Sequence, residues 1–343
     1  MSDIAIGIDG RAGRITLTRP AALNALTYDM VLATEAALDA WRDDPAVALV
    51  VLDAAGDKAF CAGGDIAELY ASGKAGDFAY GRTFWADEYR LNAKLAEYPK
   101  PIVSLMQGFT MGGGVGLGCH AGHRVVGETS RIAMPECGIG LVPDVGGSLL
   151  LARAPGRLGA YLGLTAARME AGDAILAGFA DHFVPQDRWA ELIAALCKTG
   201  DAAEVDRVSE TAPQGPLRAL LPQIDALFAS DDLPGTLAAL RGDDSGFATD
   251  TLKAVTRNSP LAMACTLEIL SRLRAPGTTI RDALDLEYRV TWRAMEQGDF
   301  LEGIRAAIID KDRKPVWKHD IDTLPATAVS EMLAPLGKDA LSL

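Results

Sequence analysis

Two acidic residues, Glu136 and Asp144, stand in a segment that is otherwise apolar or rich in glycine and proline, residues 134–147. Surroundings of this kind exclude water, and a carboxyl group removed from water keeps its proton to a higher pH. A carboxyl group with a raised pKa is suited to general acid–base catalysis near neutral pH. Glu136 has no apolar run to cap, which favours a catalytic role. Asp144 fits a catalytic role and the N-cap of a helix over residues 145–152 equally well.

A third acidic residue, Glu88, interrupts the apolar face of a helix predicted over residues 77–98. The positions of this face recur at helical spacing and are occupied by Tyr80, Phe84, Leu91, Leu95 and Tyr98. A carboxylate on a buried face costs several kcal/mol unless it is paired or used. Glu88 therefore either faces a ligand cavity or lies at the edge of the face, where Arg90 or Lys94 would pair with it.

Two glycine-rich segments, residues 59–66 and 111–118, leave backbone N–H groups without obvious partners. Closely spaced glycines cost conformational entropy, which indicates that something approaches the backbone there. The N-terminus of a helix in the second segment, paired with the N–H of Gly64 in the first, would form an oxyanion hole for a carbonyl that gains negative charge. Tight turns and close helix packing explain each segment equally well. A phosphate-binding role is weaker, because neither segment has a nucleotide-binding glycine pattern.

The elements that position these residues follow from periodicity. Alternating side chains predict a hairpin over residues 4–8 and 14–18, and apolar runs over residues 47–52 and 101–106 predict strands buried on both sides. Strands that alternate with helices indicate an α/β core. After residue 184 helical patterns dominate, over residues 189–197, 216–228, 260–273 and 280–295. We therefore expect a core over residues 1–190 and a mainly helical region over residues 191–343.

The composition excludes several classes of function. The 343-residue chain has a net charge of −13 and 49% hydrophobic residues, which is sufficient for a sizeable buried core. An acidic chain lacks the basic surface that binds a phosphate backbone, so nucleic acid is not an expected partner. No apolar run reaches the roughly 18 residues of a membrane span, and residues 1–10 lack the pattern of a signal peptide. We expect a cytoplasmic protein that does not enter a membrane.

Cysteine and histidine usage gives no sign of a metal site. The five cysteines are scattered and form no CxxC pair, so we expect reduced thiols in the core. His120 and His123 have the spacing of two ligands on one helix face, but no further ligand stands at a suitable spacing. We therefore expect no bound metal.

These segments together resemble the enoyl-CoA hydratase/isomerase (crotonase) superfamily over nearly the whole chain. The resemblance rests on residues 17–26, 59–66, 108–118 and 134–147. Within the superfamily, the branch of 3-hydroxyisobutyryl-CoA hydrolases is the most similar. This finer resemblance rests on residues 84–92, 112–116, 134–136, 143–147 and 299–317.

The resemblance implies an α/β fold, a crotonase-like spiral of ββα units with a helical C-terminal region. It also implies an acyl-CoA substrate and no cofactor, since coenzyme A is part of the substrate. By position, the N–H groups of Gly64 and Gly113 hold the thioester carbonyl. Glu136 is the chief catalytic carboxylate and Asp144 assists it. The residues that contact the acyl group are Glu88, Gly113, Glu136 and Asp144.

Position 116 distinguishes between two activities of the superfamily. Hydratases of the superfamily usually carry a second glutamate at this position and so resemble this chain less here. Gly116 has no side chain that could transfer a proton. The expected reaction is therefore hydrolysis of the thioester of a short 3-hydroxyacyl-CoA. Glu136 either attacks the carbonyl or activates water, Asp144 orients the water and helps the thiolate leave, and Glu88 binds the 3-hydroxyl group.

Two alternatives stay open. One is an enoyl-CoA hydratase that uses Glu136 and Asp144 in place of two glutamates. The other is a non-catalytic acyl-CoA-binding or scaffold protein that kept the fold. The presence of both glycine segments and both carboxylates argues against the second.

The resemblance also bears on binding and assembly. An acidic protein needs local basic residues to bind the phosphates of coenzyme A. Arg19, Lys311 and Lys314 are candidates, although surface lysines also serve solubility. The resemblance implies a homo-oligomer, either a trimer or a hexamer.

Overall fold

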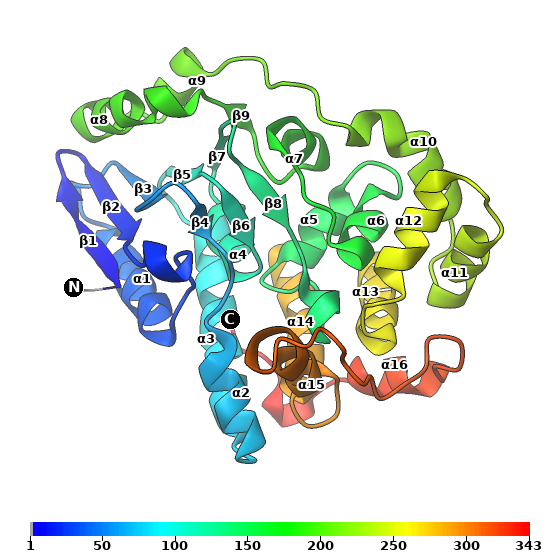
Figure 1. The fold of residues 1–343 in the computed structure, drawn as a ribbon. Helices are drawn as coiled ribbons and strands as arrows, with labels where there is room; N and C mark the ends of the chain where they lie inside the picture. Colours follow the sequence, from blue (N-terminus) through cyan, green and yellow to red (C-terminus); the bar gives the residue numbers. More distant parts are fainter. Residues whose placement is uncertain (1–2) are drawn as a thin grey trace. The chain divides into compact units, whose positions relative to one another are not determined.

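The computed structural model describes residues 3–343, and the strands in this range form two β-sheets (Figure 1). The larger sheet has the order β1 (Ile4–Asp9), β2 (Ala12–Leu17), β3 (Leu49–Ala54), β5 (Ile102–Met106), β7 (His123–Val126) and β9 (His182–Phe183). The smaller sheet has the order β4 (Ala59–Cys61), β6 (Phe109–Met111) and β8 (Arg131–Ala133). The β1–β2 hairpin is antiparallel, as predicted, and the other strand pairs are parallel.

Three consecutive ββα repeats contribute to both sheets. Each repeat places its first strand (β3, β5 or β7) in the larger sheet and its second strand (β4, β6 or β8) in the smaller one. The helices that follow each second strand are α2 (Ile66–Lys74) with α3 (Phe78–Ala96), then α4 (Gly113–Gly118), then η2 (Glu136–Ile139) with α5 (Gly147–Arg153). This order of elements confirms the expected α/β class and its ββα units.

The chain forms two compact units. The sheet unit consists of the described part of Met1–Asp65 together with Arg90–Ala133 and Arg168–Arg218. The helical unit consists of Ile66–Tyr89, Met134–Ala167 and Ala219–Leu343. Each unit therefore takes three separate segments of the sequence, and both sheets belong to the sheet unit.

The core of the sheet unit lies against one face of the larger sheet. Alternate residues of β3, β5 and β7 contribute to it: Leu49, Val51, Val103, Leu105 and Val125. The helices α8 (Trp189–Thr199) and α9 (Glu204–Val208) cover this face with Trp189, Leu192, Leu196 and Val205. The remaining helices of this unit are η1 (Pro20–Ala22), α1 (Tyr28–Trp41), α7 (Ala171–Ala177) and η3 (Gln186–Arg188).

The central helix of the helical unit is α13 (Pro260–Leu273), which begins at an N-cap serine, Ser259. It contacts α5, α6 (Leu158–Thr165), α11 (Leu233–Arg241), α14 (Ile280–Ala294) and α16 (Ala326–Met332). The other helical elements after residue 200 are α10 (Leu217–Leu227), α12 (Gly246–Val255), α15 (Phe300–Ile304), η4 (Arg305–Ile309) and η5 (Gly337–Asp339).

No strand is assigned between α8 and Leu343, so the predicted helical C-terminal region is confirmed. A domain boundary near residue 190 stays a prediction. None of the helices in residues 3–343 combines the length and hydrophobicity that a membrane crossing requires. The same residues contain no group of three or more His, Cys, Asp or Glu side chains that could hold a metal ion. The five cysteines are buried.

The contact between α4 and β4 requires glycine at position 114. A Cβ atom on Gly114 would lie 2.2 Å from the carbonyl oxygen of Cys61, a backbone atom of β4. Gly7 in β1 differs, because nothing lies within 4 Å of its Cβ position.

We expect Gly114→Ala to lower the free energy of unfolding by about 2 kcal/mol, because a methyl group in a filled site forces the backbone to shift. Gly7→Ala is the control and should change that free energy by less than about 1 kcal/mol. Urea denaturation followed by circular dichroism measures both variants. Equal stabilities of Gly114→Ala and the wild type would contradict the packing argument.

Candidate active site

In the first glycine segment of the sheet unit, the backbone N–H of Gly64 points away from the adjacent residue Leu26. The N–H of Leu26 donates to the carbonyl of Gly63 at 2.9 Å, and the N–H of Asp65 donates to the carbonyl of Leu26 at 2.8 Å. Gly64 lies between these two bonds in a parallel bridge, so its own N–H points away from Leu26. That N–H makes no hydrogen bond within the described chain.

The second glycine segment begins α4 beside the first. Gly112 has a φ of 50°, a conformation that favours glycine, and Gly113 is the first residue of the helix. The N–H of Gly113 has no intrahelical acceptor, as expected at a helix start. Because Gly114 packs directly against Cys61, the start of α4 lies beside the end of β4. The sheet unit thus brings together the two segments that carry the predicted oxyanion donors.

Four buried carboxyl groups lie together in the helical unit: Glu88, Glu136, Asp144 and Glu287. Each of them interacts electrostatically with at least one of the others. None makes an ion pair with a lysine or arginine of the described chain. Four carboxylates without a cation cannot all be ionised at once, so the cluster holds protons near neutral pH.

Glu88 lies on the buried face of α3 and not at its edge. Its side chain is 3% exposed. Burial raises the pKa of Glu88 well above its usual range, and the nearby charge of Asp144 raises it further. Arg90 and Lys94, the alternative partners, both bind Glu35 within the sheet unit, at 2.9 Å each. The surface ion pair considered for Glu88 is therefore wrong.

Glu136 begins the short helix η2 and is also buried. Its Oε2 atom has no hydrogen-bond partner within residues 3–343. Burial raises the pKa of Glu136 well above its usual range, and the charges of Asp144, Glu287 and Glu88 act in the same direction. A buried acid with an uncommitted oxygen can take a proton from a reacting molecule or give one to it.

Asp144 does not cap α5, because the N-cap position belongs to Gly146 and receives no side-chain hydrogen bond. The hydroxyl of Tyr89 instead donates to Asp144 Oδ2 at 2.8 Å. Burial raises the pKa of Asp144 to about 7, although the bond from Tyr89 acts in the opposite direction. A group with this pKa changes charge near neutral pH, which general acid–base chemistry requires.

Sequence reasoning missed Glu287, which lies on α14 and is fully buried. It accepts hydrogen bonds from the backbone N–H groups of Gly146 and Ser148 and from the Ser148 hydroxyl. Burial raises the pKa of Glu287 to about 8 against these bonds. Its signal is the one that identified Glu88, an acid within an apolar face at helical spacing. The other buried positions of that face include Ala283, Leu284, Val290 and Ala294.

Asn92 is a second residue that sequence reasoning did not single out. It follows Glu88 by one turn on α3, so the two side chains project from one face of this helix. Asn92 is buried, and neither its amide nitrogen nor its oxygen has a partner in the described chain. Such an orphaned amide indicates a missing polar group, either water or ligand.

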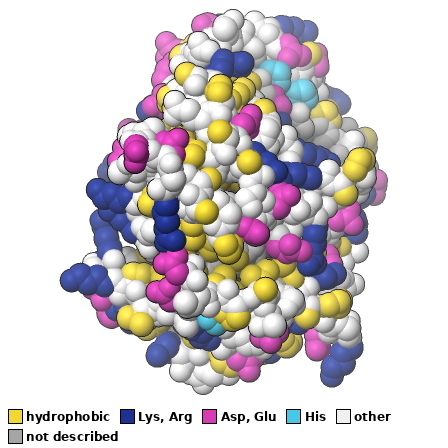
Figure 2. All heavy atoms as spheres, turned by 90° about the vertical axis from the view of Figure 1, so that its right-hand side faces the viewer, with side chains coloured by type: hydrophobic (Ala, Val, Ile, Leu, Met, Phe, Trp, Pro, Cys, Tyr) yellow, Lys and Arg dark blue, Asp and Glu magenta, His cyan; other side chains and the backbone are white. Residues whose placement is uncertain are grey.

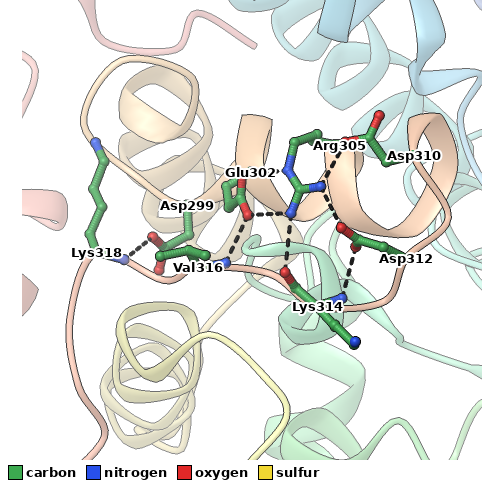
Figure 3. Close-up of polar contacts among 8 residues, drawn as sticks. All are labelled: Asp299, Glu302, Arg305, Asp310, Asp312, Lys314, Val316 and Lys318. Carbon is green, nitrogen blue, oxygen red and sulfur yellow. Dashed lines mark hydrogen bonds and ion pairs between the residues drawn. The ribbon is translucent and has the colours of Figure 1, made fainter.

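The candidate basic residues differ in their surroundings. Arg19 is occupied within the sheet unit, since it pairs with Asp3 and Asp65. Lys311 and Lys314 lie in an exposed segment of the helical unit that is organised by Arg305. Arg305 binds three carboxylates and one backbone carbonyl, those of Glu302, Asp310, Asp312 and Lys314 (Figure 3). Figure 3 shows the Lys314 side chain directed away from Arg305.

A cavity of about 400 Å³ lies elsewhere in the helical unit, between α11, α13 and the segment that leads into α16. Figure 2 faces these helices and shows hydrophobic side chains among acidic and basic ones. The acids that line the cavity have partners: Asp231 pairs with Arg157 and Arg274, and Asp322 pairs with Arg241. No predicted site residue lines it.

A sequence profile described as enoyl-CoA hydratase/isomerase matches residues 12–333. The chain belongs to the enoyl-CoA hydratase/isomerase family. A family member from Gallus gallus, named 3-hydroxyisobutyryl-CoA hydrolase, mitochondrial, is 37% identical over all of this chain and 91% of its own length. A Rattus norvegicus protein of the same name is 40% identical over 90% of this chain and 82% of its own.

A solved structure extends the likeness within the enoyl-CoA hydratase/isomerase family. It is described as an enoyl-CoA hydratase from Rhodobacter sphaeroides 2.4.1. It is 62% identical to this chain, each chain covers the whole of the other, and the TM-score is 0.96. The names of these relatives therefore describe two different reactions of acyl-CoA thioesters.

The carboxyl cluster predicts how stability depends on pH. Asp144 loses its proton near pH 4 in an unfolded chain but at about pH 7 in the folded protein. A group whose pKa rises on folding contributes stability at low pH, and this contribution is lost as the pH rises through the folded-state pKa. The raised pKa values of Glu88, Glu136 and Glu287 act in the same direction.

We therefore expect the free energy of unfolding to fall between pH 5 and pH 8, and to fall less in Asp144→Asn, which cannot ionise. Chemical denaturation at several pH values measures both slopes. Asp250→Asn, at an exposed position of α12, is the control and should keep the wild-type slope. A wild-type stability that does not fall over this range would contradict the raised pKa values of the cluster.

Proposed function

We propose that this family member hydrolyses the thioester of a short 3-hydroxyacyl-CoA, with 3-hydroxyisobutyryl-CoA as the first candidate substrate. The names of the Gallus gallus and Rattus norvegicus relatives support this activity. The observation that carries the proposal is the buried pair Glu136 and Asp144, both with raised pKa values, in a protein whose α4 contains no acid.

Hydration of an enoyl-CoA is the second candidate, because the Rhodobacter sphaeroides structure is described as a hydratase. Hydratases of the superfamily are expected to carry a second glutamate at the position of Gly116, from which this chain departs. Helix α4 has the sequence GGVGLG, and none of its side chains can carry a proton. This composition of α4 favours hydrolysis over hydration.

In the proposed reaction, the N–H groups of Gly64 and Gly113 stabilise the thioester oxygen as it gains negative charge. Removing one such donor costs roughly 3 kcal/mol of transition-state stabilisation in other enzymes. The free N–H groups of both glycine segments support this role.

Glu136 takes part in forming the new bond to the acyl carbon. It either takes a proton from water as the water oxygen attacks, or attacks the carbon itself to form an anhydride that water then opens. The bond between carbon and sulfur breaks, and the thiolate leaves with its electron pair. Asp144 orients the water and, when protonated, gives its proton to the departing sulfur. No further reactant is needed, so the proposed reaction requires no cofactor.

Glu88 binds the 3-hydroxyl group of the acyl chain in this proposal. Burial raises the pKa of Glu88 well above its usual range and so favours its protonated form. A neutral carboxyl group can both donate a hydrogen bond to a hydroxyl and accept one from it. This property suits a site that distinguishes hydroxylated from plain acyl groups.

Other parts of the proposal concern binding and location. Lys311 and Lys314 are exposed and available for the phosphates of coenzyme A, whereas the ion pairs of Arg19 make it a weaker candidate. We keep a cytoplasmic location and a trimer or hexamer as predictions. Cell fractionation and analytical ultracentrifugation test them, and the mitochondrial label in the names of two relatives gives the alternative location.

We expect the purified protein to release free thiol from 3-hydroxyisobutyryl-CoA and to leave the enoyl absorbance of crotonyl-CoA unchanged. A thiol reagent measures the first reaction and ultraviolet absorbance the second. Loss of enoyl absorbance without thiol release would overturn the proposal in favour of a hydratase. Binding of both compounds without any product would indicate a non-catalytic acyl-CoA-binding protein.

We expect Glu136→Gln to reduce thiol release by at least about a hundredfold, because the amide can neither accept the proton of water nor attack the carbonyl. Circular dichroism establishes that the variant is folded. The control is Glu268→Gln, which removes a partly exposed acid of α13 that pairs with Arg272. A folded Glu136→Gln with near-normal rates would remove Glu136 from the mechanism.

We expect Glu88→Ala to reduce the preference for 3-hydroxyisobutyryl-CoA over isobutyryl-CoA by a factor on the order of ten or more, since a site that pairs with a hydroxyl discriminates against its absence. The ratio of the two kcat/KM values is the measurement. Glu88→Gln is the matched variant, because its amide resembles a protonated carboxyl group, and it should retain most of the preference. An unchanged ratio in Glu88→Ala would assign the hydroxyl to another residue.

A further inference from the structure

The side chain of Asp144 accepts a hydrogen bond from a residue of α3, Tyr89. The Tyr89 hydroxyl donates to Asp144 Oδ2 at 2.8 Å and lies 3.4 Å from the Thr291 hydroxyl of α14. Tyr89 and Thr291 are both completely buried, so water does not compete for these bonds. A phenol that donates to a carboxylate stabilises its charged form.

The backbone that follows Asp144 is bound by a residue of α14, Glu287. The segment after it, residues 145–148, contains two residues with positive φ, Val145 at 53° and Gly146 at 77°. A β-branched residue in this conformation is strained and needs support from its surroundings. The support comes from Glu287, which accepts the N–H of Gly146 at 2.8 Å and the N–H of Ser148 at 3.2 Å.

Tyr89 and Glu287 come from different helices, and they affect different properties of Asp144. Tyr89 contacts an oxygen of Asp144, so it affects how readily Asp144 takes up a proton. The hydrogen bonds that Glu287 accepts come from the segment after Asp144 and not from Asp144 itself, so Glu287 affects the position of Asp144. Glu287 and Thr291 are one helical turn apart, so both contributions of α14 come from one face of that helix.

We propose that Tyr89 and Glu287 are positioning residues of the reaction: Tyr89 sets the protonation of Asp144, and Glu287 fixes the strained segment that places Asp144. The inference rests on the proposed function, in which Asp144 orients water and protonates the leaving sulfur. Neither residue touches the substrate in this scheme.

The titratable groups around Asp144 are all acidic. Glu88 and Tyr89 face it from α3, Glu136 from η2 and Glu287 from α14. No lysine or arginine of the described chain pairs with any of these groups. The Tyr89 hydroxyl is therefore the side-chain donor that stabilises the charge of Asp144, and its removal has a defined direction.

The test for Tyr89 is Tyr89→Phe, with Tyr80→Phe as the matched control. Tyr80 lies on the same helix, and its hydroxyl donates to the exposed Glu68 at 2.6 Å. Without the donor, the pKa of Asp144 rises, so the limb of the kcat/KM profile near pH 7 should move up by about one pH unit. Tyr80→Phe should keep the wild-type profile. A Tyr89→Phe profile that does not move would overturn the role of Tyr89.

The test for Glu287 is Glu287→Gln, with Asp285→Asn as control. Asp285 lies on α14, is 40% exposed and pairs with Arg289. A glutamine offers one acceptor oxygen where the glutamate offers two, so either Gly146 or Ser148 loses its acceptor. Hydrogen exchange at these two amides should become at least about tenfold faster, and kcat should fall about tenfold or more with KM nearly unchanged. The pH limb should stay in place, and Asp285→Asn should match the wild type.

Ser148→Ala provides a second variant if Glu287→Gln does not fold. It removes only the hydroxyl that donates to Glu287 and keeps the N–H at position 148. We expect a smaller loss of kcat, about threefold, with faster exchange at the position 148 amide. Unchanged exchange and kcat in both variants would overturn the role of Glu287.

Failure of this inference is distinguishable from failure of the proposed function. If the wild type releases no thiol from 3-hydroxyisobutyryl-CoA, the function fails, and amide exchange at Gly146 and Ser148 still tests the hold by Glu287. If the wild type releases thiol while Tyr89→Phe and Glu287→Gln behave like their controls, the function stands and the positioning roles are wrong.

Discussion

Removing a carboxylate from water costs more free energy than one hydrogen bond returns, yet the cluster of four acids in the helical unit is buried without a lysine or arginine as partner. Protons replace the missing cations. Burial raises the pKa values of Glu88 and Glu136 well above their usual range, while the hydroxyl of Tyr89 opposes this effect at Asp144, whose pKa is about 7. Hydrogen-bond donors from the surrounding helices reach some of these acids and not others. This difference in hydrogen bonding gives the acids different chemical roles.

The sheet unit, in contrast, leaves backbone N–H groups without hydrogen-bond acceptors. Parallel pairing of β4 with β6 brings the segments after these two strands next to each other. Glycine at position 114 allows α4 to begin against the carbonyl of Cys61. The regular hydrogen bonds of the sheet end there, so the donors of Gly64 and Gly113 are left over as a result of the topology. Close packing requires glycine at position 114, and the positive φ of Gly112 favours glycine there.

The sequence alone predicts those features that depend on local spacing. The β1–β2 hairpin and the alternation of strands and helices follow from periodicity, which also places Glu88 in an apolar face but does not decide whether it is buried. Glu287 obeys the same rule as Glu88 on α14 and could have been found in the same way. Spacing could not choose between the two roles of Asp144, because the bond that decides comes from Tyr89, 55 residues earlier in the chain. The partners of Arg90 and Lys94 were equally inaccessible, since Glu35 lies on a different helix.

The interleaving of the two units has a consequence for the order of folding during synthesis. The carboxyl cluster takes Glu88 from the first segment of the helical unit, Glu136 and Asp144 from the second, and Glu287 from the third. Before residue 287 leaves the ribosome, the segment after Asp144 has no acceptor for its free N–H groups and its strained residues are unsupported. A nascent or truncated chain thus carries three of the four acids but not the arrangement that tunes them. The buried acid cluster therefore takes its final form only when the chain is nearly complete.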